Sequence, residues 1–293
     1  MTILVLGASG QVASHLREFL PDAHYWGRKE FDLRNPTGLP AAIAAVAPSF
    51  IVNAAAYTAV DRAETDRDAA WSVNTEAVAM AARAAARLDV PLLHLSTDYV
   101  FDGTKEGAYA VEDACNPLGA YGRSKLGGEL AVQLLAPKSW ILRTSWVFSE
   151  HGSNFVKTIV RLARDREELR IVADQFGRPT YGGHLARLVA EIAQDTAGVP
   201  RLPYGVHHAV GGAPISWHGF AQAVVDEATR QNLLVRTPRV TAISTAEYPT
   251  AARRPANSVL LPSAALGAVF GVDFDWPSGL AKTIEYLRGP VTS

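Results

Sequence analysis

Tyr121 and Lys125 form the residue pair whose spacing most directly suggests chemistry. Residues four positions apart on a helix share one face and lie one turn from each other. A neighbouring ammonium stabilises a phenolate, so we expect Lys125 to lower the pKa of Tyr121. A phenol prepared in this way can exchange a proton with a substrate oxygen near neutral pH. The pair therefore predicts a proton-transfer site.

A glycine-containing turn, Gly7-Ala8-Ser9-Gly10-Gln11-Val12-Ala13, follows the short apolar run at 3–6 and precedes a helical pattern. Glycines between a strand and a helix let the backbone approach a pyrophosphate, which then lies on the helix N-terminus. Ala13 takes the third glycine position and is small enough for close packing. We expect Gly7 and Gly10 to form a dinucleotide-binding turn.

The adenosine end of that site is expected after a second strand near residues 23–26. Gly27-Arg28-Lys29 follows this run, where an NAD-binding protein usually has an acidic residue for the ribose hydroxyls. Arg28 and Lys29 would suit a 2′-phosphate, which favours NADPH and leaves NADH open. Asp32 and Leu33, just downstream, are candidates to hold the adenine.

Ser96, Thr97 and Asp98 end another apolar run, at 91–95. Ligands of open α/β sheets bind at the carboxyl ends of the strands. We therefore expect Ser96 or Thr97 to hold a carbonyl oxygen beside Tyr121.

The elements that would position these residues alternate along the first half of the chain. Strands are predicted at 3–6, 50–53, 91–95 and 139–143, and helices at 11–20, 69–88 and 121–135, the last with Leu126, Leu130, Leu134 and Leu135 on one side. This alternation is typical of a Rossmann-like doubly wound parallel α/β sheet.

After about residue 150 proline and glycine become denser, and helices are predicted at 155–164, 184–194 and 217–230. We interpret residues 1–150 as a dinucleotide-binding domain. Residues 151–293 are interpreted as a smaller, irregular substrate-binding lobe, parts of which cross back to the sheet.

Composition excludes several classes of protein. With 28 Lys plus Arg against 29 Asp plus Glu, the net charge of −1 argues against a basic nucleic-acid-binding face. Cys115 is the one cysteine, so neither an internal disulfide nor a cysteine-rich zinc site is expected. Neighbouring His207 and His208 would point to opposite faces of a strand, and we predict no metal site. Without a signal peptide or a membrane-spanning run, we expect a cytoplasmic protein with no membrane partner.

The glycine turn, the Ser/Thr strand end and the Tyr-x-x-x-Lys pair together resemble the extended short-chain dehydrogenase/reductase superfamily. Longer segments narrow the resemblance to the dTDP-4-dehydrorhamnose reductase family and cover nearly the whole chain. They are residues 53–61, 96–103, 143–148, 174–180 and 254–258.

This resemblance implies reduction of the C4 keto group of dTDP-4-dehydro-L-rhamnose to dTDP-L-rhamnose by NADPH or NADH. It implies that Tyr121 donates the proton, that Lys125 assists it and binds the cofactor, and that Thr97 hydrogen-bonds the carbonyl. The implied substrate contacts are Thr97, Asp98 and Trp146. The implied cofactor contacts are Gly10, Gln11, Val12, Asp32, Leu33, Ala56, Tyr57, Thr58 and Leu95.

Arg178 and Arg254 lie in loops of the second lobe that are rich in, or bounded by, glycine and proline. Arginine can grip a phosphate with two parallel hydrogen bonds. We predict that both contact the substrate's phosphates or sugar.

Other readings stay open. A related nucleotide 4-keto-6-deoxysugar could be the substrate. The chain could also be a non-catalytic regulatory subunit, as in methionine adenosyltransferase. A 4-epimerase would share the motifs but retain its NAD, whereas a 4,6-dehydratase carries Thr-Asp-Glu where this chain has Tyr99 in third place.

Some family members bind Mg²⁺ between subunits through a Glu that His15 replaces, which argues against a metal-bridged dimer and leaves a monomer or a homodimer.

Overall fold

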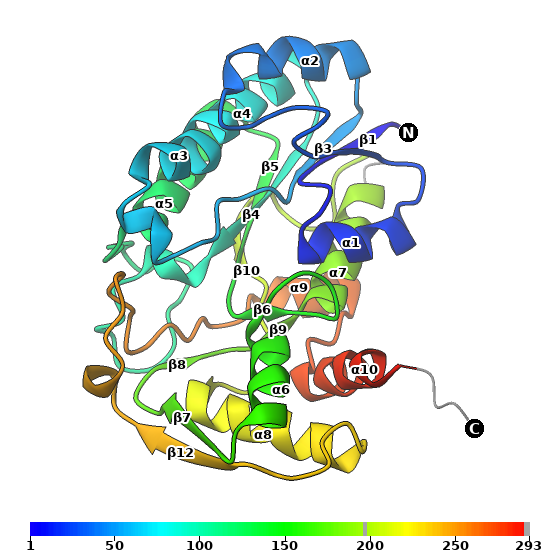
Figure 1. The fold of residues 1–293 in the computed structure, drawn as a ribbon. Coiled ribbons are helices and arrows are strands. Elements are labelled where there is room, and N and C mark those ends of the chain that lie inside the picture. Colours follow the sequence, from blue (N-terminus) through cyan, green and yellow to red (C-terminus); the bar gives the residue numbers. More distant parts are fainter. Residues whose placement is uncertain (196–197, 290–293) are drawn as a thin grey trace.

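A six-stranded sheet organises the molecule, and every neighbouring pair of its strands is parallel (Figure 1). The computed structural model describes residues 1–195 and 198–289. In sheet order the strands are β10 (Gly205–His208), β5 (Ser139–Thr144), β4 (Leu92–Thr97), β3 (Phe50–Asn53), β1 (Ile3–Leu6) and β2 (His24–Trp26). The predicted Rossmann-like fold class is confirmed.

Helices cover both faces of the sheet (Figure 1). On one face lie α1 (Gln11–Phe19) and α7 (Gly182–Gln194), and on the other lie α2 (Leu39–Val46), α4 (Ala77–Leu88) and α5 (Ala120–Leu135). Val5 of β1 packs into the cluster beneath α1 and α7, whereas Leu4 and Leu6 pack into the cluster beneath α2 and α4. Burial on both faces explains why this strand is an unbroken apolar run.

The helix expected at 69–88 is interrupted. It consists of α3 (Arg67–Trp71), a π-helical turn at Ser72–Glu76 and α4. Asn74 in the π turn is fully buried, and a Cβ built on Gly128 of α5 would lie only 2.2 Å from its carbonyl oxygen. The π turn therefore lies where α5 approaches most closely, and π turns often occur near functional sites.

The apolar side expected for α5 is only half right, because Leu126 and Leu135 pack partly buried against apolar clusters whereas the other two leucines do not. Leu130 and Leu134 are 55% and 84% exposed. The fully buried face carries Tyr121 and Val132 together with small or polar residues: Ser124, Lys125, Gly128 and Glu129. On this face Glu129 forms a buried ion pair with Arg143 of β5, a contact that the leucine spacing does not indicate.

The second lobe has its own hydrophobic core, formed mainly by α6 (Phe155–Asp165), α8 (Trp217–Arg230) and α10 (Trp276–Arg288). Short strand pairs border it: β7 (Glu168–Val172) with β12 (Arg239–Ile243), β8 (Phe176–Gly177) with β11 (Ile215–Ser216), and β6 (Val147–Phe148) with β9 (Thr180–Tyr181). Between these segments the chain returns to the main sheet through α7 and β10, and α9 (Ala264–Phe270) packs there too (Figure 1). No helix among the described residues is long and apolar enough to cross a bilayer.

Candidate active site

Thr97 and Tyr121 meet at the carboxyl end of β4. Thr97 is the last residue of that strand and Tyr121 is the second residue of α5, and their side chains are hydrogen-bonding neighbours. Lys125 follows one turn later and donates a hydrogen bond from Nζ to the carbonyl oxygen of Leu95, at 2.7 Å. The structure thus brings the three proposed catalytic side chains to one strand end.

The pKa of Tyr121 differs from the sequence-based expectation. Burial raises this pKa to about 12, against a lowering contribution from the Thr97 hydrogen bond. Lys125 does not offset the burial, because its ammonium is turned toward Leu95 and His94. The expected lowering by Lys125 was therefore wrong for this structure. A phenol with a high pKa stays protonated at neutral pH, which is the state that a proton donor requires.

Thr97 and Asp98 hold each other in place. The Thr97 hydroxyl donates to Asp98 Oδ1 at 3.0 Å and accepts from the backbone N–H of Tyr99 at 3.2 Å. Asp98 is buried, and this burial raises its pKa to about 6. The strand end thus presents an oriented hydroxyl beside a carboxyl group that titrates near neutral pH.

Two contacts that sequence reasoning missed, one buried and one partly buried, anchor α5 at the site. Glu129 accepts two hydrogen bonds from Arg143 Nε and one from its Nη2, at 2.8–3.1 Å, and a further one from the Ser96 hydroxyl. At the other end of the catalytic segment, Glu64 accepts from the backbone N–H of Ala120 at 2.7 Å. Both carboxylates come from parts of the sequence with no motif to mark them.

The glycine turn lies against the end of β3. Gly7 has φ +105°, and a Cβ there would lie 2.7 Å from the backbone nitrogen of Ala55. The first turn of α1 contains no acidic residue. The turn has a backbone conformation that favours glycine, and the partial positive charge of the helix N-terminus behind it has no acidic side chain beside it. Both features fit the pyrophosphate of a dinucleotide.

The side chains that follow the turn are engaged with the protein. Gln11 donates from Nε2 to the carbonyl oxygen of Val147 at 3.2 Å and accepts from Asn154 Nδ2 at 2.9 Å. Val12 is buried in the core. Gln11 therefore ties the glycine turn to the second lobe.

The turn after β2 contains an acidic group that sequence reasoning missed. Glu30 accepts a hydrogen bond from the backbone N–H of Gly27 at 2.8 Å, and both Glu30 and Arg28 are exposed. Downstream, Asp32 pairs with Arg34 at 2.5 Å, and Leu33 is partly buried. Both a cation and a carboxylate thus stand where the adenosine ribose of a dinucleotide would lie.

The remaining proposed cofactor contacts follow β3 and β4. The N–H of Tyr57 donates to Asn74 Oδ1 at 2.8 Å, and its hydroxyl donates to Asp66 at 3.0 Å. Ala56 and Leu95 are partly buried and Thr58 is exposed. Asn74 also donates to Ser124 of α5, so the Tyr57 segment is joined to the helix that carries Tyr121.

Trp146 is held in an unusual conformation. Its φ is +47°, and its ring stacks on Trp217 with the ring centres 3.4 Å apart and the planes 7° from parallel. A Cβ on Gly177 would lie 2.4 Å from the Trp146 ring. Strained backbone of this kind is concentrated at functional sites.

The two proposed phosphate-binding arginines have different surroundings. Arg254 forms an ion pair with Asp61 at 2.7 Å and is a hydrogen-bonding neighbour of Tyr99, which places it beside the Thr97–Asp98 strand end. Arg178 donates to the carbonyl oxygen of Gly211 at 3.3 Å and lines a pocket of about 270 Å³ between residues 208–212 and α9. Among the residues that the structure describes, Arg254 contacts the Thr97–Asp98 strand end through Tyr99, and no such contact is found for Arg178.

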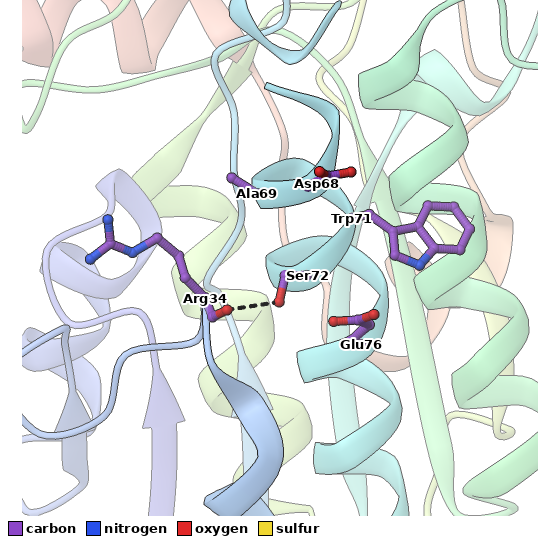
Figure 2. Close-up of a pocket in the computed structure, with 6 residues that line it drawn as sticks. All are labelled: Arg34, Asp68, Ala69, Trp71, Ser72 and Glu76. Atoms are coloured by element: carbon purple, nitrogen blue, oxygen red, sulfur yellow. Dashed lines mark hydrogen bonds between the residues drawn. The ribbon is translucent and has the colours of Figure 1, made fainter. Parts of the chain in front are cut away.

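A pocket of about 460 Å³ is lined by residues of the 34 and 68–76 segments, none of them a proposed catalytic residue. Figure 2 shows its lining, in which the Ser72 hydroxyl donates to the carbonyl oxygen of Arg34 at 2.9 Å. This contact joins the proposed adenine segment to the π turn.

His15 is buried, and its Nε2 lies 3.4 Å from Glu150 Oε2. Together with His151, these residues bring three potential ligand atoms within 4.8 Å of one another, a grouping that sequence reasoning did not anticipate. Glu150 also accepts from the Tyr181 hydroxyl, so the group joins α1 to the second lobe internally.

Comparison with known proteins identifies the family. The RmlD substrate binding domain model matches residues 1–288. A dTDP-4-dehydrorhamnose reductase from Aggregatibacter actinomycetemcomitans is 44% identical over 295 residues, which cover 98% of this chain and 99% of the relative.

Solved structures of similar fold point to the same family. A dTDP-4-dehydrorhamnose reductase from Clostridium acetobutylicum has a TM-score of 0.89 at 31% identity and covers 98% of this chain and 100% of its own. One from Bacillus anthracis, solved in complex with NADP, has a TM-score of 0.87 at 32% identity, with 97% and 99% covered. The chain therefore belongs to the dTDP-4-dehydrorhamnose reductase family.

Proposed function

We propose that this protein reduces the C4 keto group of dTDP-4-dehydro-L-rhamnose to the hydroxyl of dTDP-L-rhamnose, with NADPH or NADH as the reductant. The observation that carries the proposal is the placement of Tyr121. A buried, protonated phenol lies against the Thr97 hydroxyl at a strand end of a Rossmann-like sheet. The family relationship supplies the substrate class, and the NADP in the Bacillus anthracis structure supports the cofactor class.

The residues present fit a nicotinamide dinucleotide. Gly7, Gly10 and the N-terminus of α1 would hold the pyrophosphate, and Arg28, Glu30 and Asp32 would lie near the adenosine end. When bound, the reduced nicotinamide supplies a hydride to the keto carbon.

The chain's own residues would handle the oxygen and its proton. The Thr97 hydroxyl, whose proton points to Asp98 Oδ1 in this structure, would turn to donate to the carbonyl oxygen, and Tyr121 would donate its proton to that oxygen as negative charge develops. Lys125, held by the Leu95 carbonyl oxygen, would bind the nicotinamide ribose. A positioned proton donor contributes typically about 10²–10⁴-fold to the rate.

The test is oxidation of NADPH or NADH on addition of dTDP-4-dehydrorhamnose freshly generated by its epimerase. We expect substrate-dependent loss of reduced-nicotinamide absorbance and formation of dTDP-rhamnose. Binding of the nucleotide sugar with no turnover under either cofactor would contradict the proposal and favour a regulatory subunit.

A further inference from the structure

His94 lies directly beneath Lys125 in the centre of the sheet, and the steps above do not use it. It is fully buried on β4, and its Nε2 lies 3.3 Å from Lys125 Nζ. Its other ring nitrogen, Nδ1, lies 3.0 Å from Nδ2 of Asn53 on the neighbouring strand β3. A buried imidazole with both nitrogens engaged must take one tautomer to satisfy its partners.

Asn53 determines which tautomer that is. The backbone N–H of Ala55 donates to Asn53 Oδ1 at 3.1 Å, and a backbone N–H can only donate. The amide NH₂ of Asn53 must therefore point toward His94, where it donates to Nδ1. With Nδ1 as the acceptor, the ring proton of neutral His94 is on Nε2 and points at Lys125.

This polarity has a consequence for Lys125. An ammonium has three donors and no acceptor, so it cannot accept the Nε2–H of His94, whereas a neutral amine can. The Leu95 carbonyl already accepts from Nζ at 2.7 Å, which keeps the side chain in place in either state. Lys125 thus faces a hydrogen-bond donor that disfavours its charged form.

We propose that His94, oriented by Asn53, is a positioning residue that presents its Nε2–H to Lys125 and so weakens the binding of a proton by this lysine. The inference builds on the function proposed above only in linking Lys125 to catalysis.

Other groups around Lys125 are consistent with this role. Burial lowers the pKa of Lys125 to about 8, and Glu129 on the same helix acts in the opposite direction. Glu129 is itself neutralised by Arg143 of β5. Burial of His94 itself, and secondarily the charge of Lys125, holds the pKa of His94 well below its usual range, so the imidazole is neutral. Tyr121, one turn earlier on α5, is protonated.

The first test reads the tautomer directly and needs no substrate or cofactor. NMR of isotope-labelled histidine, with His94 assigned by the signal lost in His94→Gln, should show Nε2–H at a pH about one unit above the pKa of Lys125. Lys125→Met should keep this tautomer, because Asn53 alone imposes it. An Nδ1–H tautomer in the wild-type protein would overturn the proposal.

The second test reverses the direction of the hydrogen bond between His94 and Lys125. In Asn53→Asp the carboxylate accepts from both Ala55 and His94, so the ring proton moves to Nδ1 and Nε2 becomes an acceptor for the Lys125 ammonium. We expect the Nδ1–H signal. We also expect the alkaline limb of the kcat profile, where kcat falls as Lys125 loses its proton, to move up by roughly one pH unit or more. Gln194→Glu, exposed at the end of α7, adds the same charge far from the site and should leave tautomer and limb unchanged.

An Asn53→Asp protein that keeps Nε2–H would overturn the proposal, as would a tautomer change without any shift of the limb. Should no substrate be turned over by the wild-type protein, the function proposed above fails while the tautomer measurement still decides the role of His94.

Discussion

The carboxylate of Glu64 accepts a hydrogen bond from the backbone N–H of Ala120 at 2.7 Å, and so caps the helix that carries Tyr121. The helix has no cap of its own, because Gly119 at its N-cap makes no side-chain hydrogen bond. A contact across 56 positions of sequence thus fixes the first turn of α5, and with it the phenol.

Removal of this cap should affect both stability and turnover. Glu64→Ala leaves the N–H of Ala120 without its acceptor, and we expect a loss of about 0.5–2 kcal/mol in the free energy of unfolding together with a lower kcat. Denaturant unfolding and steady-state kinetics measure the two effects. Glu64→Gln keeps an acceptor oxygen and should recover most of each; equal losses in both variants would argue against the cap.

Tyr121→Phe removes the proposed proton donor while keeping the ring. We expect kcat to fall by roughly 10²–10⁴-fold with a modest change in KM, because the hydroxyl acts mainly in the transition state. Steady-state assays with the dTDP-sugar measure this. Tyr286→Phe, at a tyrosine that is 62% exposed on α10, serves as the control. Near-normal turnover of Tyr121→Phe would remove Tyr121 from the mechanism.

Arg254 and Asp61 offer a way to separate phosphate binding from structure. If Arg254 grips the substrate's phosphates, Arg254→Ala should raise KM for the dTDP-sugar by about tenfold or more, as expected for loss of a charged hydrogen bond. Asp61→Asn removes the ion-pair partner but leaves the arginine, so its KM should be unchanged or lower. An equal rise in both variants would mean that the pair only shapes the loop.

Asp98 should make stability depend on pH in the direction opposite to most carboxylates. Its pKa in the folded chain is about 6, above the ordinary 3.8, so the folded chain binds the proton more tightly than the unfolded chain. The stability contribution of Asp98 is therefore greatest below pH 3.8 and falls as the pH rises to about 6.

Asp98→Asn removes this titration. Above pH ~6 we expect the variant to be more stable than the wild-type protein by roughly 1–3 kcal/mol, with the difference shrinking toward pH ~4. Thermal unfolding of both proteins across this range measures it. A variant that is less stable at every pH would show that burial of the charged Asp98 carboxylate does not destabilise the folded protein.

The end of β2 should govern the choice of cofactor. Arg28→Ala is expected to raise KM for NADPH more than for NADH, because a 2′-phosphate loses its cation. Glu30→Gln should weaken NADH more, because a carboxylate that accepts from ribose hydroxyls is lost. The ratio of kcat/KM for the two cofactors measures both effects, and a ratio that neither change moves would place the adenosine ribose elsewhere.

The sequence was most informative where function depends on local order along the chain. The runs at 3–6 and 50–53, the glycine turn and the strand end at Thr97 all lie where alternation and spacing predicted them. Each of these signals is contained within a few neighbouring residues, so no knowledge of distant contacts was needed.

Sequence reasoning failed where a distant partner decides the outcome. Leu130 and Leu134 follow helical spacing yet are exposed, whereas the neighbouring Glu129 is buried in an ion pair with Arg143. The lowering expected for the pKa of Tyr121 assumed that Lys125 faces the phenol, whereas its side chain is turned toward the strand, where Nζ donates to the Leu95 carbonyl oxygen beside His94. Glu30 was overlooked because its carboxylate folds back onto Gly27 from three residues away.

The return of the chain to the sheet through α7 and β10 limits how this protein can be dissected. A fragment ending near residue 150 would lack both elements, leaving β5 as an open edge and uncovering the apolar surface of α1 that α7 now shields. Exposed edges and apolar faces of this kind promote aggregation. Studies of the nucleotide-binding half by itself would therefore require a circular permutation or co-expression of the complementary piece.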